Sequence, residues 1–471
     1  MLCRVICTLL FLAWTAEPPI AADPVLYCGL WRSPLEALGF LFVSVPGLGL
    51  TVWQILMLVL APVSLLWPGA LRRRGGITDA AILVSLASVV LTFAWGVARG
   101  GSAYNAYYQL WRFLAALLVG VVLLSVIRSP RDLKAVGLTV LLAALVRATL
   151  AIYFYWMVVS GRVSPAPLYM TTHDDSLLFV AGLLVAVSWA LARGKVRAWA
   201  AAALVSTYVL YAIVLNNRRL AWIEALLVFV LAYAILPRGR TRRRTTLTLA
   251  VVAPILLVYV TVGWGRQEGV FAPLQAFSTT SSYEDASTLA REEEIRNLLY
   301  TVWSAGNPLL GTGWGMPYRK VTSFYANYGN EWWQYGYLPH NSLLGVVVFA
   351  GLIGLCGIWI VVPVTAFLGT RGYRGALGPV ERAGAMSAVC ILPAYGAQCY
   401  GDIGFQSFTC ALVLGVAIGV AGKVSAWADA ASETAGRRAS GPGTRVPAAA
   451  RLRHERPVPA PGIVTLRERV G

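Results

Sequence analysis

Residues 342–365, SLLGVVVFAGLIGLCGIWIVVPVT, contain no charged side chain. A helix needs roughly 20 apolar residues to cross the ~30 Å hydrocarbon layer of a bilayer. This stretch therefore predicts a membrane-spanning helix. Further apolar segments of similar length run over 49–67, 79–97, 109–127, 135–158, 176–192, 198–215, 220–236, 246–263, 383–398 and 404–421.

The composition of the whole chain is that of a protein whose surface is mostly covered by lipid. Of 471 residues, 58% are hydrophobic and only 13% are charged, about half the usual ~25% of a soluble protein. So few charges cannot cover the surface of a soluble fold this long. The formal charge of +18 does not indicate nucleic-acid binding, because no soluble module presents a basic stripe with interleaved aromatic residues.

The basic residues predict which way the spans point. Alternate loops at 72–74, 128–134, 193–197, 238–244 and 371–382 each hold three or more Lys or Arg, which marks the cytoplasmic side. The opposite short loops hold only Arg99, Arg162, Arg218 and Arg219. This parity places the long loop at 264–341 on the outer face.

These patterns predict an all-α polytopic membrane protein. Residues 1–24 resemble either a cleaved signal or a first membrane segment, which gives 11 or about 12 transmembrane helices, and we favour retention. Residues 25–263 and 342–422 hold the remaining spans, with the loop at 264–341 between them. Residues 423–471 are rich in Ala, Gly, Pro and Arg and predict a disordered basic tail in the cytoplasm.

Histidine is rare, and only His173, His340 and His454 occur. His340 lies where the outer loop re-enters the membrane, and its side chain is the one in that loop that exchanges a proton most readily near neutral pH. The alternative is a helix-entry histidine bonded to backbone. The cysteines show no metal-type spacing with histidine, and we expect neither a metal nor a cofactor.

Arg218 and Arg219 break the charge pattern, since they lie in an outer turn, NNRR, between two spans. Two adjacent guanidiniums at that depth favour an anionic partner such as phosphate. The alternatives are snorkelling to lipid headgroups, or pairing with Glu224 or with loop carboxylates. TTHDDS at 171–176 is either a polar cluster around His173 and Asp174 or a helix-capping turn.

The sequence of the outer loop predicts an amphipathic helix over 287–303, capped by Ser287 and followed by turns. GTGWG at 311–315 follows no strand and opens no clear helix, so the context of a phosphate-binding loop is missing.

Three segments together resemble the O-antigen ligase and Wzy-type polysaccharide polymerase superfamily. They are NNRRLAWIEALL at 216–227, AREEEIRNLLYTVWSAGNPLLGTGWGMPY at 290–318 and PHNSLLGVVVFAGLIGL at 339–355. The similarity covers roughly residues 170–360. It implies a GT-C-like membrane glycosyltransferase that uses a saccharide linked to undecaprenyl diphosphate, at the periplasmic face of the bacterial inner membrane.

The resemblance also implies roles for individual residues. His340 corresponds to the family's catalytic base, which deprotonates the acceptor hydroxyl and predicts inversion at the anomeric carbon. Arg218 or Arg219, with a loop arginine, corresponds to the groups that hold the diphosphate; Arg291 is preferred over Arg296. Further candidate substrate contacts are His173, Asp174, Tyr318 and Asn341, with Trp314, Trp332 and Trp333 as sugar-stacking or, more in keeping with their type, interfacial aromatics.

Two products fit this resemblance. Transfer to another lipid-linked repeat makes a polymerase, which we favour because many glycans need one, and transfer to lipid A core makes a ligase. A chain-length regulator and a flippase are the implied protein partners. A transporter is the alternative of another class, but the chain shows no internal repeat, and a loop of ~75 residues is unusual for one.

Overall fold

The computed structural model describes residues 2–16, 41–42, 45–46, 50–66, 76–162, 169–264, 266, 271, 274, 277, 286–322 and 336–439. Within these ranges the chain forms helices and no strand. The long helices are α1 (Leu2–Ala16), α3 (Val52–Leu66), α4 (Gly76–Ala98), α5 (Ala103–Val126), α6 (Pro130–Phe154), α7 (Asp175–Arg193), α8 (Val196–Asn216), α9 (Arg219–Ile235), α10 (Arg240–Gly263), α12 (Ala286–Ala305), α14 (Ser342–Gly357), α15 (Val361–Gly375), α16 (Pro379–Gly401) and α17 (Phe408–Ala439).

The predicted all-α polytopic membrane fold is confirmed. Each predicted span overlaps one of these helices, except that 342–365 covers α14 and the start of α15. Eight spans in the described part of the chain are long and apolar enough to cross a bilayer. α1 and α3 are shorter apolar helices, so the total of about twelve crossings stays a prediction. The eight are α4, α5, α6 with the π-helical turn Tyr155–Val159, α7, α8, α10, Ser342–Gly375 and the part of α17 up to Thr434.

The span that begins at Ser342 is not one straight helix. Gly351 takes φ +58° inside α14, and a 3-10 turn at Ile358–Ile360 joins α14 to α15. A left-handed residue breaks the helical hydrogen-bond ladder, and glycine adopts this conformation without steric cost. The break frees the carbonyls of Val348 and Phe349, which accept from the N–H groups of Thr312 and Gly313 at 2.7 and 2.9 Å.

The chain divides into two compact units, Met1–Ala428 and Asp429–Gly471. Nearly all described residues belong to the first unit. α17 is helical to Ala439, past the predicted start of the tail at residue 423, and Lys423 is buried. Of the second unit the structure describes only residues 429–439.

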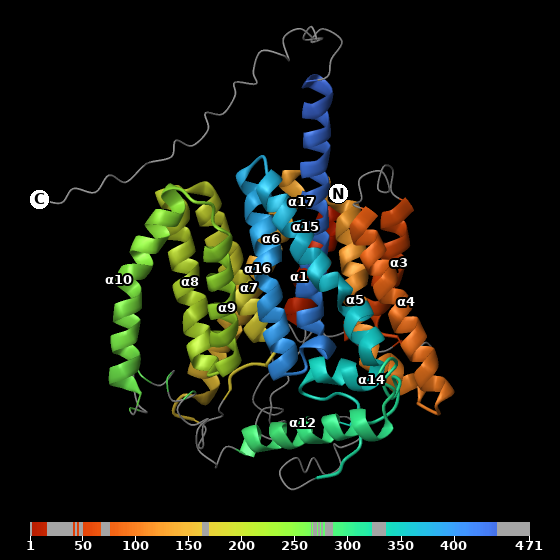
Figure 1. Cartoon of the computed structure of the whole chain (residues 1–471). Coiled ribbons are helices and arrows are strands. Elements are labelled where there is room, and N and C mark those ends of the chain that lie inside the picture. Colours follow the sequence, from red (N-terminus) through yellow and green to blue (C-terminus); the bar gives the residue numbers. More distant parts are fainter. Residues whose placement is uncertain are drawn as a thin grey trace, which may run out of the picture. The chain divides into compact units, whose positions relative to one another are not determined.

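Small residues let the helices of the first unit pack closely. A Cβ added to Gly415 of α17 would lie 2.7 Å from the carbonyl oxygen of Ala116 in α5, and one added to Gly182 of α7 would lie 2.5 Å from Cβ of Ala144 in α6. Such close contacts stabilise helix association in lipid, where the hydrophobic effect does not drive helices together. α7 and α16, which pack against each other and against α6 and α9, form the centre of the bundle, while α10 is almost wholly exposed at its edge (Figure 1).

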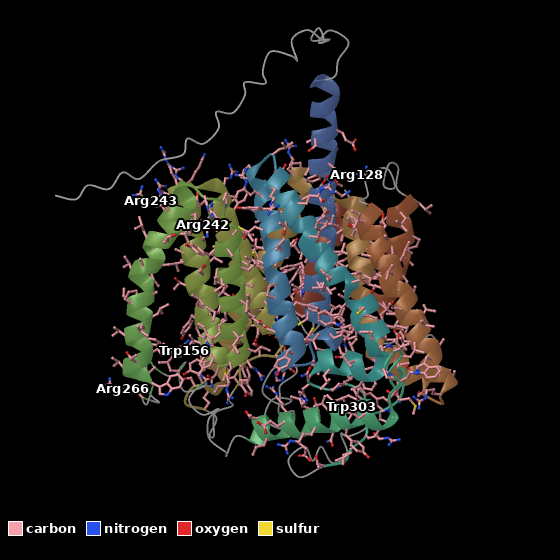
Figure 2. The ribbon with its side chains drawn as sticks, viewed as in Figure 1. Arg128, Trp156, Arg242, Arg243, Arg266 and Trp303 are labelled. Atoms are coloured by element: carbon pink, nitrogen blue, oxygen red, sulfur yellow. The ribbon has the colours of Figure 1, made fainter. Side chains whose placement is uncertain are left out.

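The two ends of the bundle differ in charge. Arg128, Arg242 and Arg243 lie at one end, whereas Trp156, Arg266 and Trp303 lie at the other (Figure 2). This separation agrees with the pattern of basic loops that predicts the cytoplasmic side. We therefore refer below to the basic end and the α12 end.

α12 lies across the ends of the spanning helices (Figure 1), where the sequence predicts an amphipathic helix over 287–303. The side chain of Ser287, the predicted cap, is outside the described residues. One face of α12 is buried at Glu294, Asn297, Leu298 and Thr301, positions three or four apart that share a helix face. Asn297 accepts from the N–H groups of Val321 and Thr322 at 2.9 and 3.0 Å, which fastens the following turns to the helix.

The GTGWG segment is a packing element. Trp314 is fully buried and donates from Nε1 to Thr92 Oγ1 at 2.9 Å. Gly313 takes φ +94°, and a Cβ there would overlap the backbone of Gly96 in α4. Its glycines thus serve close backbone contact.

We predict that Gly313→Ala lowers the free energy of unfolding by about 2 kcal/mol or more, because both its φ and its contact with Gly96 exclude a side chain. Thermal unfolding of the purified protein in detergent measures the effect. Gly396→Ala is the control, since a Cβ there meets nothing within 4 Å and alanine favours the helix. Equal melting temperatures for the two variants would contradict the prediction.

Candidate functional site

Two imidazole–carboxylate pairs lie at the α12 end of the bundle. His340 Nδ1 is 3.0 Å from Glu294 Oε2, and the Glu294 side chain is 1% exposed. His173 Nδ1 is 2.6 Å from Asp402 Oδ2, whose side chain is 3% exposed. In both pairs a partly exposed histidine covers a buried acid, which is the arrangement that orients an imidazole and fixes its tautomer.

His340 is held by the start of α14 and by α12. Asn341 caps α14, because its side chain accepts from the N–H of Leu344 at 3.0 Å. The N–H of Asn341 donates to Glu294 Oε1 at 3.2 Å. Glu294 therefore binds both residues of the His-Asn pair, one with each oxygen, and Asn341 is a structural cap next to the histidine.

Asp402 is the residue that follows α16, and its backbone is also fixed. Ser342 Oγ lies 3.0 Å from the carbonyl oxygens of both Cys399 and Asp402, and it accepts from the N–H of Phe405 at 3.2 Å. The beginning of α14 is thus tied to the end of α16. This contact brings the segment that carries His340 next to the residue that binds His173.

Arg218 is buried beside the second pair. Its Nη1 lies 2.9 Å from His173 Nδ1, its Nη2 lies 3.5 Å from the carbonyl oxygen of Thr171, and its guanidinium stacks 3.3 Å from the centroid of the Tyr169 ring. One ring nitrogen cannot donate to Asp402 and accept from Arg218 at once. With the shorter contact to the carboxylate, the proton on Nδ1 belongs to the bond with Asp402, and Arg218 is stabilised by the charge of Asp402 and by the tyrosine face.

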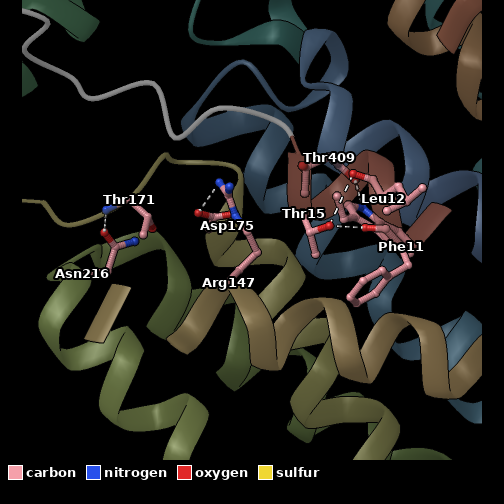
Figure 3. Close-up of polar contacts among 9 residues, drawn as sticks. Phe11, Leu12, Thr15, Arg147, Thr171, Asp175, Asn216 and Thr409 are labelled. Carbon is pink, nitrogen blue, oxygen red and sulfur yellow. Dashed lines mark hydrogen bonds and ion pairs between the residues drawn. The ribbon is translucent and has the colours of Figure 1, made fainter. Parts of the chain in front are cut away.

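The turn that presents Arg218 is built by two asparagines. Asn217 takes φ 47°, the left-handed conformation that ends α8. Asn216 Oδ1 accepts from the N–H of Met170 at 3.0 Å. It also accepts from the N–H of Thr171 at 2.8 Å, as Figure 3 shows. These bonds hold the segment before α7 against the turn, which places Tyr169 and Thr171 at the guanidinium.

Arg147, the arginine within the α6 span, is not part of this group. It forms a two-pronged ion pair with Asp175 at the start of α7, with both N···O distances 2.8 Å (Figure 3). Both side chains are almost fully buried. This pair joins α6 to α7 and gives Asp175 of the TTHDDS segment a structural role.

Glu224 was the alternative partner for the arginine turn. Its carboxylate oxygens accept no hydrogen bond from any described residue.

The two loop arginines face different ways. Arg296 is 73% exposed and pairs with Glu292 on the same helix at 3.6 Å. Arg291 is half-buried, and its positive charge lowers the pKa of Arg218, His340 and Asp402 alike. Arg291 therefore shares an electrostatic site with these three groups, and Arg296 lies on the outer face of α12.

Burial and neighbouring charges set the pKa values of the site. Burial lowers the pKa of Arg218 to about 10, so its guanidinium stays charged at neutral pH. Burial alone would raise the pKa of Asp402, but the charge and hydrogen bond of His173, with His340 and Arg291 nearby, bring it below its ordinary value.

His340 shows the opposite balance. Burial alone would lower the pKa of His340, but the hydrogen bond and charge of Glu294, together with the charge of Asp402, raise it above its ordinary value. The ring is therefore protonated over a wider pH range than an isolated histidine.

The remaining candidate residues lie at the edge of this group or in the core. Arg219 begins α9 and Asp174 directly precedes α7, and both are half-buried. Tyr318 is 2% exposed, so it is a core position in this structure. Trp314 is neither a surface stacking residue nor an interfacial one, since it packs against Phe349 and Phe405. Trp332 and Trp333 lie outside the described residues.

The sequence analysis missed Glu294 and Asp402. Glu294 is in a run of three glutamates, of which both Glu293 and Glu294 are buried, so helical spacing does not single out the one that binds His340. Asp402 is the one acidic residue of the short outer loop 399–403. An acid at membrane depth indicates a buried partner, so the sequence alone could have marked Asp402 as a candidate.

The fold and this site define a class: a multi-pass helical membrane protein with a cluster of guanidinium, imidazole and carboxylate groups at one end of its bundle, beneath an amphipathic helix. Residues 204–358 match the family described as O-antigen ligase. This match confirms the resemblance to the O-antigen ligase and Wzy-type polymerase superfamily, and it implies an enzyme of glycosyltransferase type. No curated protein matches the chain.

The matched stretch contains Arg218, Arg291, Glu294 and His340, while His173 and Asp402 lie outside it. The site is therefore completed by helices on both sides of the matched domain.

We predict that Glu294→Gln lowers the pKa of His340, because the amide keeps an acceptor but removes the negative charge that stabilises the imidazolium. NMR titration of the isotope-labelled protein measures this, since the three histidines of the chain are distinguished by substituting each in turn. Glu292→Gln, an exposed acid of the same helix, should leave the titration of His340 unchanged. An unchanged value in Glu294→Gln would mean that Glu294 does not set it.

Proposed function

We propose that this protein transfers a saccharide from a lipid-linked diphosphate to an acceptor hydroxyl at the periplasmic face of the bacterial inner membrane. The observation that supports this most is geometric: Ser342 ties the segment that carries His340 to Asp402, which binds His173, and Arg218 lies 2.9 Å from that histidine. Guanidiniums bind phosphate oxygens in pairs, and an imidazole accepts the single proton that such a transfer releases.

His340 acts as the base in this proposal. Its Nδ1 is engaged by Glu294, so Nδ1–H donates to the carboxylate and Nε2 keeps the lone pair that accepts a proton. The acceptor oxygen loses its proton to Nε2 and attacks the anomeric carbon. The bond from that carbon to the diphosphate oxygen breaks, its electrons remain on the diphosphate, and the configuration at the carbon is inverted.

Arg218 and Arg291 stabilise the negative charge that grows on the leaving diphosphate. The diphosphate is already a good leaving group, so the reaction needs orientation, charge compensation and one proton acceptor, and we propose that it proceeds without a metal. Arg219, Asp174 and His173 border the arginines and are positioned to contact the saccharide.

We favour a polymerase that joins lipid-linked repeats, with a flippase supplying the donor and a chain-length regulator as partner. The matched family is described as O-antigen ligase, so transfer of finished polymer to lipid A core is the second candidate. The lipid-linked glycan that builds up in a deletion strain separates them by mass. Single repeats indicate a lost polymerase, and long polymer on the lipid carrier indicates a lost ligase.

We predict that His340→Ala reduces glycan transfer by about 10²–10⁴-fold, the usual contribution of a general base, while the lipid-linked precursor accumulates. Transfer with purified donor and acceptor measures the rate directly. His340→Gln separates loss of the proton acceptor from loss of packing, since it keeps a polar side chain at the same place. Polymer formation at the normal rate in both variants would remove His340 as the base.

We also predict a difference between the two loop arginines. Arg291→Gln should reduce the rate about 100-fold, as expected for a lost charge contact to a developing anion, whereas Arg296→Gln should change it less than about twofold, because an exposed i,i+4 pair contributes little. The same assay with excess chelator tests the proposed metal independence. Equal loss in both arginine variants, or loss of activity with chelator, would contradict this assignment.

A further inference from the structure

An apolar groove with a cavity volume of about 170 Å³ opens between α6, α7, α16 and α17, away from the candidate functional site. Small side chains create it, among them Gly137, Ala181, Gly384 and Ala417. Its walls are almost entirely hydrocarbon. An apolar cavity of ~150 Å³ stays dry and accepts a hydrocarbon ligand, so water is not its natural occupant.

The direction of the helices fixes where this groove opens. Lys134 and Val380 lie in the first turns of α6 and α16, and Trp189 lies near the end of α7. The groove therefore starts at the basic end of the bundle. His173 precedes α7 and Asp402 follows α16, so the candidate functional site is at the opposite ends of the same helices, about 33 Å along α16 from Val380 at the mouth of the groove.

Basic and aromatic side chains mark the mouth of the groove. Lys134 lines it, and its Nζ is 6.0 Å from the centroid of the Trp189 ring. Arg193 stacks on the same ring at 4.5 Å. The nearby carboxylate of Asp132 accepts from the N–H groups of Arg128 and Ser129 at 3.0 Å, so it serves as a helix cap. Two cations around an interfacial tryptophan suit a phosphate at the membrane surface.

We propose that this groove binds one acyl chain of an anionic phospholipid, with the phosphate at Lys134 and Arg193. The stretch from Lys134 to Leu141 on α6 is about 10 Å long, enough for the upper part of an acyl chain. If the groove were empty, every residue that lines it would lose dispersion contacts, and the bound acyl chain restores them. The bound lipid holds α6, α7 and α16 at a fixed separation.

The isoprenoid tail of a lipid-linked saccharide is a different occupant. Its diphosphate belongs at the α12 end in the proposed function, whereas the cations beside this groove, Lys134 and Arg193, lie at the basic end. The charges at the mouth indicate a lipid whose headgroup is at the basic end. The proposal does not depend on the reaction at the other end.

Native mass spectrometry of the purified full-length protein tests the proposal, with phosphatidylglycerol and phosphatidylcholine of identical acyl chains added at equal concentration. We expect one phosphatidylglycerol to bind in preference to phosphatidylcholine, and to raise the melting temperature more. Lys134→Gln should reduce that preference about fivefold, the effect of one basic side chain at an anionic surface. Lys195→Gln, which removes an exposed charge at the same end but not in the groove, should not.

A second variant tests the hydrocarbon part. A Cβ at Gly137 would be in ordinary contact with Val185 at 3.7 Å, so Gly137→Leu should fold and fill the groove. It should abolish binding of both lipids, whereas Gly396→Leu, at a helical glycine with nothing within 4 Å, should not. Equal binding of the two lipids by the unaltered protein, retention of lipid in Gly137→Leu, or release of an isoprenoid lipid in its place would overturn the proposal.

Discussion

The carboxylate of Asp402 compensates charge for several helices at once. The carboxylate binds His173 ahead of α7, and its charge favours the guanidinium form of Arg218 at the start of α9. The backbone carbonyl of the same residue accepts from Ser342 at the start of α14. Asp402 itself ends α16. Loss of one partner of a buried charge pair typically costs 3–5 kcal/mol, because the other charge is left without compensation. The ends of α7, α9 and α16 therefore depend on this one side chain, while the backbone carbonyl of Asp402 holds the start of α14.

The fold could be predicted because lipid imposes a simple rule on the sequence. Backbone polar groups in hydrocarbon must be satisfied within the segment, so apolar stretches such as 176–192 become helices with bounds close to their apolar limits, here Asp175–Arg193. The break at Gly351 was not visible in this way. It depends on Thr312 and Gly313, which occupy the freed carbonyls from another part of the chain, and hydropathy carries no information about such contacts.

Site residues were predictable from the sequence where a charged or titratable side chain lies in an unusual position for a membrane protein. They were less predictable where the charge lies among others of its kind. Arg218 and His340 stand out because a guanidinium in an outer turn and a histidine at a membrane boundary are both unusual. Glu294 does not stand out among three glutamates, and its role arises from the rotation of α12 over the bundle. Arg147 is as unusual as Arg218, yet Asp175 compensates it fully. An unusual charge thus indicates a partner, and only the structure shows whether that partner is the protein or a ligand.

The charge balance of the site bears on the transfer from a diphosphate that we propose for it. The two guanidiniums of Arg218 and Arg291 and the two carboxylates of Glu294 and Asp402 together carry no net charge when the imidazoles are neutral. A diphosphate entering such a site is bound more tightly when an imidazole is protonated, whereas His340 must be neutral to accept the proton of the acceptor. Cleavage resolves this conflict. In the proposed step the leaving diphosphate gains negative charge as His340 gains a proton, so the net charge of the site and substrate together does not change, and Arg218 and Arg291 stabilise the charge on the leaving group.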